Sequence, residues 1–122
     1  MPSEVIVERA VQCSLSGCDE MAEASLSLQP FCRHHVIAAC RQRLDAAIFM
    51  ASQQPLSVDS AVSAAAVSSF CRDAAKELMK NAHDLSQPDQ AKLVDILLRV
   101  EYISQLVAKS QNLASPPVSF RL

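Results

Sequence analysis

The chain has 122 residues, of which half are apolar, 4 % are aromatic and one, Gly17, is glycine. A single glycine argues against an all-β fold, whose tight turns need positive φ, and excludes Gly-rich phosphate-binding loops. A formal net charge of −2 argues against a general polyanion binder, because such proteins cluster their lysines and arginines. Closely packed helices are the favoured architecture.

Residues 1–10 contain Glu4, Glu8 and Arg9 and no apolar core, which is not the pattern of a signal peptide. No stretch has the roughly 18 apolar residues of a membrane span. We therefore expect a cytoplasmic protein without membrane contact, in which the five cysteines stay reduced. An odd number of cysteines also disfavours a complete disulfide framework.

The first predicted elements are short strands. Residues 5–11 alternate enough to form a strand, residues 13–18 form a tight loop, and residues 22–32 alternate as a hairpin with Pro30 near its exposed edge. From Arg33 the apolar spacing changes to three and four residues, which predicts an amphipathic helix that ends before Pro55.

A second helix is predicted over residues 58–82, after a linker at residues 52–57. Ser57 suits the position that caps the start of a helix. The helix is expected to bury one stripe of mostly small side chains, with Phe70 beside it, which comprises Ala64, Val67, Cys71, Ala74 and Leu78.

A third helix is predicted over residues 87–110, with Ser86 as its cap. The short connection before it makes the second and third helices an antiparallel hairpin. Its apolar residues cover more than one face, so we expect it to be central or shared with a second chain. They are Leu93, Val94, Ile96, Leu97, Leu98, Val100, Tyr102, Ile103, Leu106 and Val107.

The predicted fold is therefore mostly α with a small β element, in which an N-terminal zinc-bound knuckle and β-hairpin precede three helices. Residues 1–35 form the zinc-binding finger, and residues 36–112 form a helical bundle continuous with it. Residues 113–122 contain Pro116 and Pro117 and are predicted to be an extended tail.

Cys13, Cys18, Cys32 and His35 form two close pairs, C-x4-C and C-x2-H, separated by thirteen residues. Thiolates and imidazole are the ligands of tetrahedral structural Zn²⁺ sites. Gly17 permits the tight loop of the first pair, and the second pair shares one face of a helix's first turn. Because the hairpin brings the pairs together, we expect one bound Zn²⁺. The alternative is that these are ordinary buried cysteines.

His34 is the rival of His35 as fourth ligand, but two residues after Cys32 it points away from the site. A loop with one ligand pair, a hairpin, and a helix whose first turn carries the second pair together resemble a treble-clef zinc finger. The resemblance covers residues 13 to about 50. It implies a zinc-bound module at this end of the chain, and treble clefs serve many functions.

Four available ligands leave no open coordination position, and no H-x-E or H-E-x-x-H motif is present. We therefore expect a structural zinc ion and no enzymatic activity. The two remaining cysteines, Cys40 and Cys71, fall on the apolar stripes of their helices. They are expected to pack in the core, with a redox role as the alternative.

Arg33, Arg41 and Arg43 lie close together in the sequence and are expected to form a solvated face. Contact with an anion or a nucleic acid is the alternative. The sequence as a whole favours a small regulatory or adaptor protein that binds a protein partner and self-associates as a dimer through its third helix. Two alternatives are a nucleic-acid-associated transcriptional regulator that uses the finger and a thiol redox sensor that releases zinc on oxidation.

Overall fold

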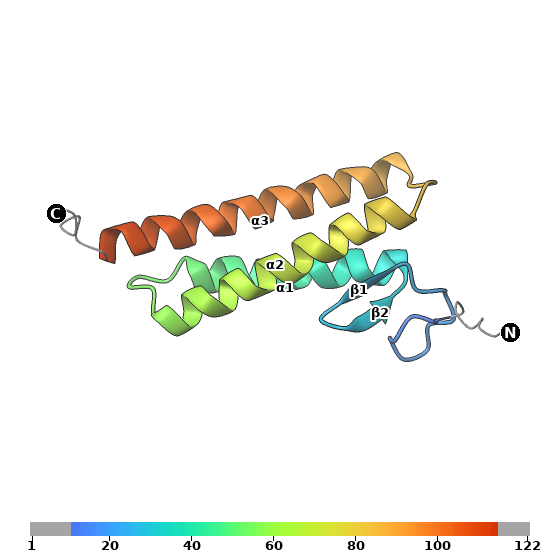
Figure 1. The fold of residues 1–122 in the computed structure, drawn as a ribbon, viewed down its shortest axis with the longest axis horizontal. Helices are drawn as coiled ribbons and strands as arrows, with labels where there is room; N and C mark the ends of the chain where they lie inside the picture. The colour runs from blue at the N-terminus through green and yellow to red at the C-terminus, as the bar shows by residue number, and fades with distance from the viewer. Residues whose placement is uncertain (1–10, 115–122) are drawn as a thin grey trace, which may run out of the picture.

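A β-hairpin followed by three helices makes up the fold, as the sequence predicts (Figure 1). The computed structural model describes residues 11–114, so most of the strand predicted over residues 5–11 lies outside the described residues. None of the helices described has the length and apolar character needed to cross a membrane. The elements are β1 (Ala24–Leu26), β2 (Gln29–Phe31), α1 (Arg33–Ala51), α2 (Val58–Asn81) and α3 (Gln87–Ala114).

The hairpin is short and closes in a two-residue turn. β1 pairs antiparallel with β2, so that Ala24 lies opposite Phe31 and Leu26 lies opposite Gln29. Ser27 and Leu28 form the turn and both have positive φ, which matches the twist of the strands that they join. The buried side chains of β1 alternate with an exposed serine, because successive residues of a strand face opposite sides.

The starts of α2 and α3 are capped as the sequence predicts. The Ser57 hydroxyl accepts a hydrogen bond from the backbone N–H of Ser60 at 3.1 Å. The Ser86 hydroxyl accepts one from the backbone N–H of Asp89 at 3.2 Å. Each bond satisfies an N–H that has no partner inside its helix. Cys32 precedes α1 without such a side-chain bond, and its thiol lies near the side chains of Cys18 and His35 instead.

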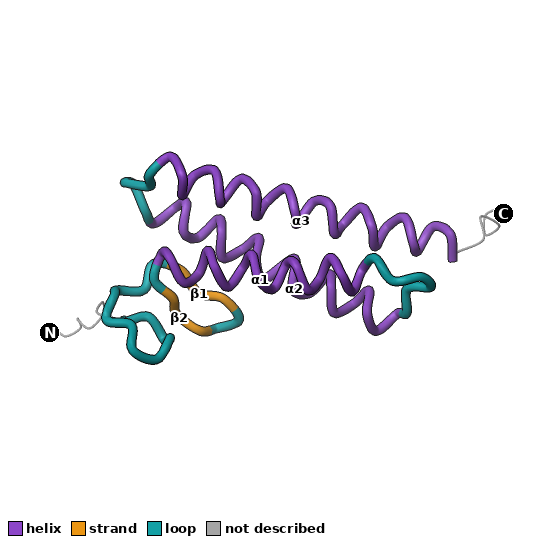
Figure 2. Tube along the Cα trace, turned by 180° about the vertical axis from the view of Figure 1, so that it is seen from behind, coloured by secondary structure: helices purple, strands orange, loops and turns teal. Residues whose placement is uncertain are grey.

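The three helices pack pairwise around one core, and α2 and α3 run antiparallel across a short loop (Figures 1 and 2). The hairpin packs on α1 and β1 also packs on α2, while α3 makes no contact with either strand. The largest fully buried side chains join the hairpin to all three helices, and they include Leu26, Leu44, Leu78, Ile96 and Ile103.

Two details of the helices differ from the prediction. Phe70 was expected beside the buried stripe of α2, but its side chain is 50 % exposed, because α2 turns its small residues toward α1 and α3 and leaves position 70 at the edge. The third helix continues to Ala114, so residues 113 and 114 are helical and do not belong to an extended tail. The helix can continue this far because the first position biased against helix is the residue before Pro116.

Candidate metal centre

Cys13, Cys18, Cys32 and His35 converge at the junction of the hairpin and α1. Cys13 and Cys18 lie in the loop before β1, Cys32 immediately precedes α1, and His35 is in its first turn. The loop turns back because Gly17 has a φ of +83°, a value that side chains disfavour. The backbone N–H of Cys18 donates to the Leu15 carbonyl at 3.0 Å, which closes this turn.

Backbone hydrogen bonds fix the loop to the hairpin. The N–H of Cys13 donates to the Glu20 carbonyl at 3.0 Å, and the N–H of Ser14 donates to the Pro30 carbonyl at 2.7 Å. Gln12 and Met21 form an isolated antiparallel bridge beside them. The first pair of cysteines is therefore held against the strand that leads directly into the second pair, at the N-terminal end of α1 (Figure 2).

Three of the distances between the donor atoms are close to those of a tetrahedral site. Nδ1 of His35 lies 3.4 Å from Sγ of Cys13 and 3.2 Å from Sγ of Cys32. Sγ of Cys18 lies 3.9 Å from Sγ of Cys32, and all four donors lie within 4.8 Å of one another. A tetrahedral zinc ion would separate two sulphurs by about 3.8 Å and a sulphur from a nitrogen by about 3.5 Å. The cluster could therefore hold a metal ion without large movement.

Backbone groups already support negative charge on one of these thiols. Burial raises the pKa of Cys13, but hydrogen bonds from the backbone N–H groups of Cys32 and Leu15 lower it to about 6. The backbone N–H of Glu20 acts the same way on Cys18, but desolvation and the neighbouring thiols leave the pKa of Cys18 above its usual value. Two thiolates this close repel each other, and a bound cation would remove that repulsion.

The structure brings His35 into the cluster and leaves His34 outside it. The His35 side chain is partly buried among the three cysteines, whereas His34 is exposed on the next position of α1. The two residues differ because a helix rotates neighbouring side chains by about 100°. His35 is therefore the histidine with the geometry of a ligand, which was the expectation from its spacing to Cys32.

The three arginines do not form one free basic patch. Arg33 makes ion pairs with Glu23 at 2.9 Å and with Asp84 at 2.7 Å, and these partners hold its pKa above the usual value. Arg41 lies 3.7 Å from Asp95 on α3. Contact of these side chains with an anion or a nucleic acid stays a prediction, and it would have to compete with the carboxylates.

Arg43 is the third of these arginines and lies beside the hairpin turn. Its Nη1 is 3.5 Å from the Ser27 hydroxyl. Of the three arginines, only Arg43 forms no ion pair with a carboxylate of the described residues. A single guanidinium at a turn is a weak anion site, because phosphate affinity comes from several converging donors.

Polar contacts between the hairpin and α2 are the part of the site that the sequence did not reveal. Glu77 accepts a hydrogen bond from the backbone N–H of Ser25 at 2.8 Å. Asn81 donates to the Glu23 carbonyl at 3.0 Å. These bonds satisfy backbone groups on the free edge of β1, and together with the Glu23–Arg33–Asp84 ion pairs they attach the metal-binding region to the end of α2. No local pattern marks the contacts of Glu77, Asn81 and Asp84, because their partners are more than 50 residues away in the sequence.

Cys40 and Cys71 face each other across the α1–α2 contact. Each thiol approaches the other residue's backbone carbonyl, at 4.0 Å and 3.8 Å, and both side chains are buried. A hydrogen bond with Cys71 and burial raise the pKa of Cys40, which keeps its thiol protonated and unreactive. The packing role expected for both residues agrees with this environment.

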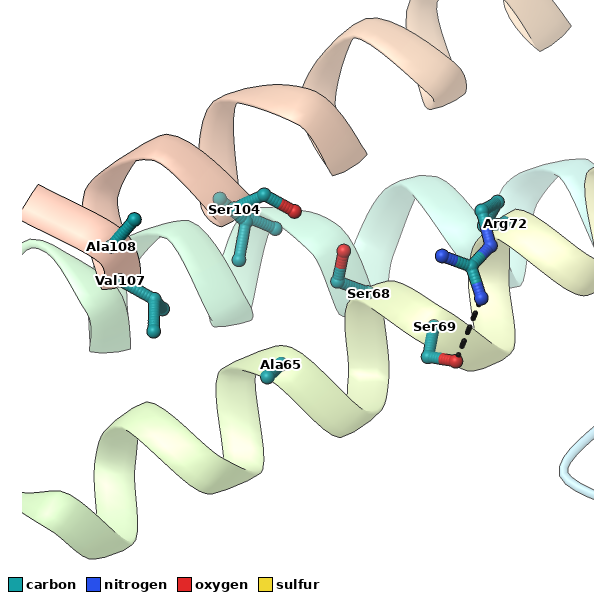
Figure 3. Close-up of a pocket in the computed structure, with 8 residues that line it drawn as sticks. Ala65, Ser68, Ser69, Arg72, Ser104, Val107 and Ala108 are labelled. Atoms are coloured by element: carbon teal, nitrogen blue, oxygen red, sulfur yellow. Dashed lines mark hydrogen bonds between the residues drawn. The ribbon is translucent and has the colours of Figure 1, made fainter.

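A shallow groove of about 270 Å³ lies between α2 and α3, away from the cysteine cluster (Figure 3). Ser68, Ser69 and Arg72 line it from α2, opposite Ile103, Ser104, Val107 and Ala108 of α3. Arg72 donates to the Ser69 hydroxyl at 3.2 Å and also pairs with Asp73. Within the described part of the chain the groove contains no pair of groups suited to nucleophilic or acid–base catalysis.

Comparison with known proteins adds no relative to this picture. No protein-family model matches the sequence, and no curated protein or solved structure is significantly similar to it. The cysteine and histidine cluster is consistent with a zinc-finger-like module, and its geometry is the basis for a functional assignment.

Proposed function

We propose that Cys13, Cys18, Cys32 and His35 bind one structural Zn²⁺ in a treble-clef-like finger. The donor set supports this, because three thiolates and one imidazole at tetrahedral separations suit zinc better than hard cations such as Mg²⁺ or Ca²⁺. Four protein ligands would fill its coordination. When bound, the ion cross-links the loop before β1 to the start of α1.

The function that we propose for the whole chain is that of a small non-enzymatic regulatory or adaptor protein that acts by protein–protein contact. The observation that carries it is a row of large apolar side chains on the surface of α3, comprising Val94, Leu98 and Tyr102. A contiguous exposed apolar patch is typical of an interaction surface. In this proposal the finger fixes the positions of α1 and α2, which pack against the side of α3 opposite the apolar row.

Elemental analysis of the purified full-length protein tests the zinc site. We expect about one zinc per chain, because the four ligands form a single site. Cys18→Ser should lose the metal, whereas Cys71→Ala should keep it, because Cys71 is buried outside the cluster. Equal metal content in the two variants, or none in the wild type prepared with zinc, would refute the site.

Affinity capture and light scattering test the adaptor role. We expect the zinc-loaded wild type to form a specific complex, with itself or with another protein, that is lost when apolar residues on the surface of α3 are replaced by charged ones. A wild type that stays monomeric and captures no protein through α3 would contradict the role. Turnover of a small-molecule substrate by the isolated protein would contradict the non-enzymatic assignment.

A further inference from the structure

α3 has two apolar faces, and only one of them packs against the rest of the molecule. Its inner face is buried and carries Leu93, Ile96, Val100 and Ile103. The opposite face carries Val94, Leu98 and Tyr102, which are 56 %, 64 % and 48 % exposed. These three residues follow one another at four-residue intervals and therefore form a continuous stripe, which we call the outer face.

The outer face continues onto a hollow at the α2–α3 junction. The hollow has a volume of about 230 Å³ and includes Val94 of the outer face. Its other lining residues are apolar except Gln90, and they include Met79, Leu85 and Leu97. The uncovered apolar surface is thus wider than one helix. α1 and α2 pack on the inner side of α3 and cannot cover it (Figure 1).

We infer that a second copy of this chain covers the outer face, with the two α3 helices antiparallel and crossing at Leu98. This inference deepens the proposed function and rests on it, because it names the partner. In such a symmetric pair each Leu98 packs on its counterpart, and Val94 of one copy packs beside Tyr102 of the other. The contact is self-complementary, since both copies present the same apolar stripe.

Charge along α3 favours a second copy in the antiparallel direction. Asp95 and Arg99 lie on the same flank of the outer face, on the side of α1, where Arg99 pairs with Asp95 and Asp45 and Arg41 approaches Asp95. In an antiparallel pair centred on Leu98, Asp95 of one copy lies beside Arg99 of the other. In a parallel pair opposite flanks meet, so the Asp95–Arg99 flank of one copy would face the flank of the other that carries Glu101, and the reciprocal Asp95–Arg99 contacts would not form.

The dimensions of the face indicate a dimer of moderate affinity. From Val94 to Tyr102 the outer face runs for about 12 Å along α3, at 1.5 Å per residue. A contact of this length, even with the adjoining hollow, lies at the small end of specific protein interfaces. We therefore expect dissociation in the micromolar range, and the dimer should be visible in the concentration dependence of its mass.

Light scattering and sedimentation of the zinc-loaded full chain over a wide concentration range test the dimer. Leu98→Asp should weaken it by roughly a hundredfold or more, because the new carboxylates would be buried against each other. The matched control is Val62→Asp, since Val62 is 62 % exposed on α2 and away from the outer face. It should leave the dimer unchanged. Helix content and zinc stoichiometry confirm that both variants fold.

Disulfide trapping tests the direction of the helices. A mixture of Val94→Cys and Tyr102→Cys proteins should form the mixed disulfide, because these positions are neighbours in the antiparallel pair. Each variant alone should cross-link poorly, since its own two positions would be about 12 Å apart along the axis. Efficient cross-linking of Val94→Cys with itself would show a parallel pair and overturn the inference.

The remaining outcomes separate this inference from the proposed function. A zinc-loaded wild type that is monomeric at all concentrations overturns the dimer. If that monomer binds another protein through Leu98, the adaptor role survives and the second copy is the wrong partner. A dimer that Val62→Asp disrupts and Leu98→Asp does not would also overturn the inference, because its interface would lie elsewhere.

Discussion

The finger, residues 11–35, and the bundle, residues 36–114, are held together in different ways. In the finger the buried apolar residues are few, and two of them are the cysteines Cys13 and Cys32. The bundle buries whole side chains of leucine and isoleucine from three helices, among them Leu44, Leu78 and Ile96. The finger is too small to bury a core of its own, so converging ligands replace hydrophobic contact there.

α1 is the element that the two regions share. Its first turn carries His35, while Leu44 in its middle is completely buried in the bundle. α2 meets the finger differently, through hydrogen bonds from Glu77 and Asn81 to the hairpin. We therefore expect that unfolding of the finger disturbs the bundle only at the first turn of α1, and that the rest of the bundle stays folded.

Removal of zinc should have the largest effect. Cys32→Ala, or a chelator, should unfold the finger, because structural zinc contributes on the order of 10–16 kcal/mol of apparent binding energy in small fingers. Hydrogen exchange should lose protection at residues 24–31 and at the start of α1, and keep it at residues 93–103 of α3. Simultaneous loss in both segments would show that the two regions fold as one unit.

Loss of a core side chain should affect the bundle next. Leu44→Ala should lower the free energy of unfolding by about 2–5 kcal/mol, because it leaves a cavity at a fully buried position of the core. Urea denaturation measures the change, and zinc stoichiometry should remain at the wild-type value. Leu28→Ala is the control, since Leu28 is 98 % exposed. If Leu44→Ala also releases zinc, the regions are more strongly coupled along α1 than we propose.

Local sequence was sufficient to predict the elements and the convergence of the metal ligands. Cys32 and His35 come together because a helix places positions three apart on one face, and Gly17 marks the turn between the first two cysteines. The caps at Ser57 and Ser86 are equally local, since each bond spans three residues. Spacing alone therefore carried this information.

The errors and omissions concern contacts between distant residues. Phe70 was placed beside the core because the sequence shows the spacing of an apolar stripe but not how far α2 rotates about its own axis. Glu77, Asn81 and Asp84 lie in ordinary polar positions of the sequence, and they become part of the site only when α2 packs beside the hairpin. Such pairings depend on tertiary structure, and no periodicity encodes them.

The ion pairs of Arg33 should contribute less than the core but measurably. Arg33→Met keeps the apolar stem and removes the hydrogen bonds to Glu23 and Asp84, which should cost about 2 kcal/mol. Because Arg33 begins α1, the loss should be greatest in the exchange protection of the hairpin. A double-mutant cycle with Glu23→Gln measures the pair itself. Additive effects of the two substitutions would show that the contact contributes nothing to docking.

The hairpin turn should become more stable by a small amount. Leu28 has a φ of +69° and almost no side-chain contact, so Leu28→Gly removes strain without removing packing. We expect a gain of about 1 kcal/mol in the free energy of unfolding, since left-handed backbone is costly for side chains with a Cβ. Thermal unfolding of the zinc-loaded protein measures it. A loss of stability would indicate that the Leu28 side chain makes contacts in solution.

Asp84 should give the smallest effect, and one that depends on pH. A hydrogen bond from Arg33 is the main reason that the pKa of Asp84 is lowered in the folded protein. The folded state therefore binds fewer protons at this carboxyl than the unfolded state, and the stabilisation is complete above the ordinary pKa of about 4. It is lost as the pH falls through the lowered value.

Asp84→Asn should consequently be less stable than the wild type at neutral pH, and the difference should shrink as the solution is acidified below pH of about 4. The side chain is 82 % exposed, so water and salt screen the pair and the neutral-pH difference should be small and salt-dependent. Glu23→Gln is the comparison, because Glu23 is less exposed and contacts the same guanidinium. If the stability difference between Asp84→Asn and the wild type grew on acidification, the ion pair with Arg33 could not be its cause. If Glu23→Gln costs more stability than Asp84→Asn, the Glu23–Arg33 pair contributes more to the attachment of the finger than the contact of Arg33 with the α2–α3 loop.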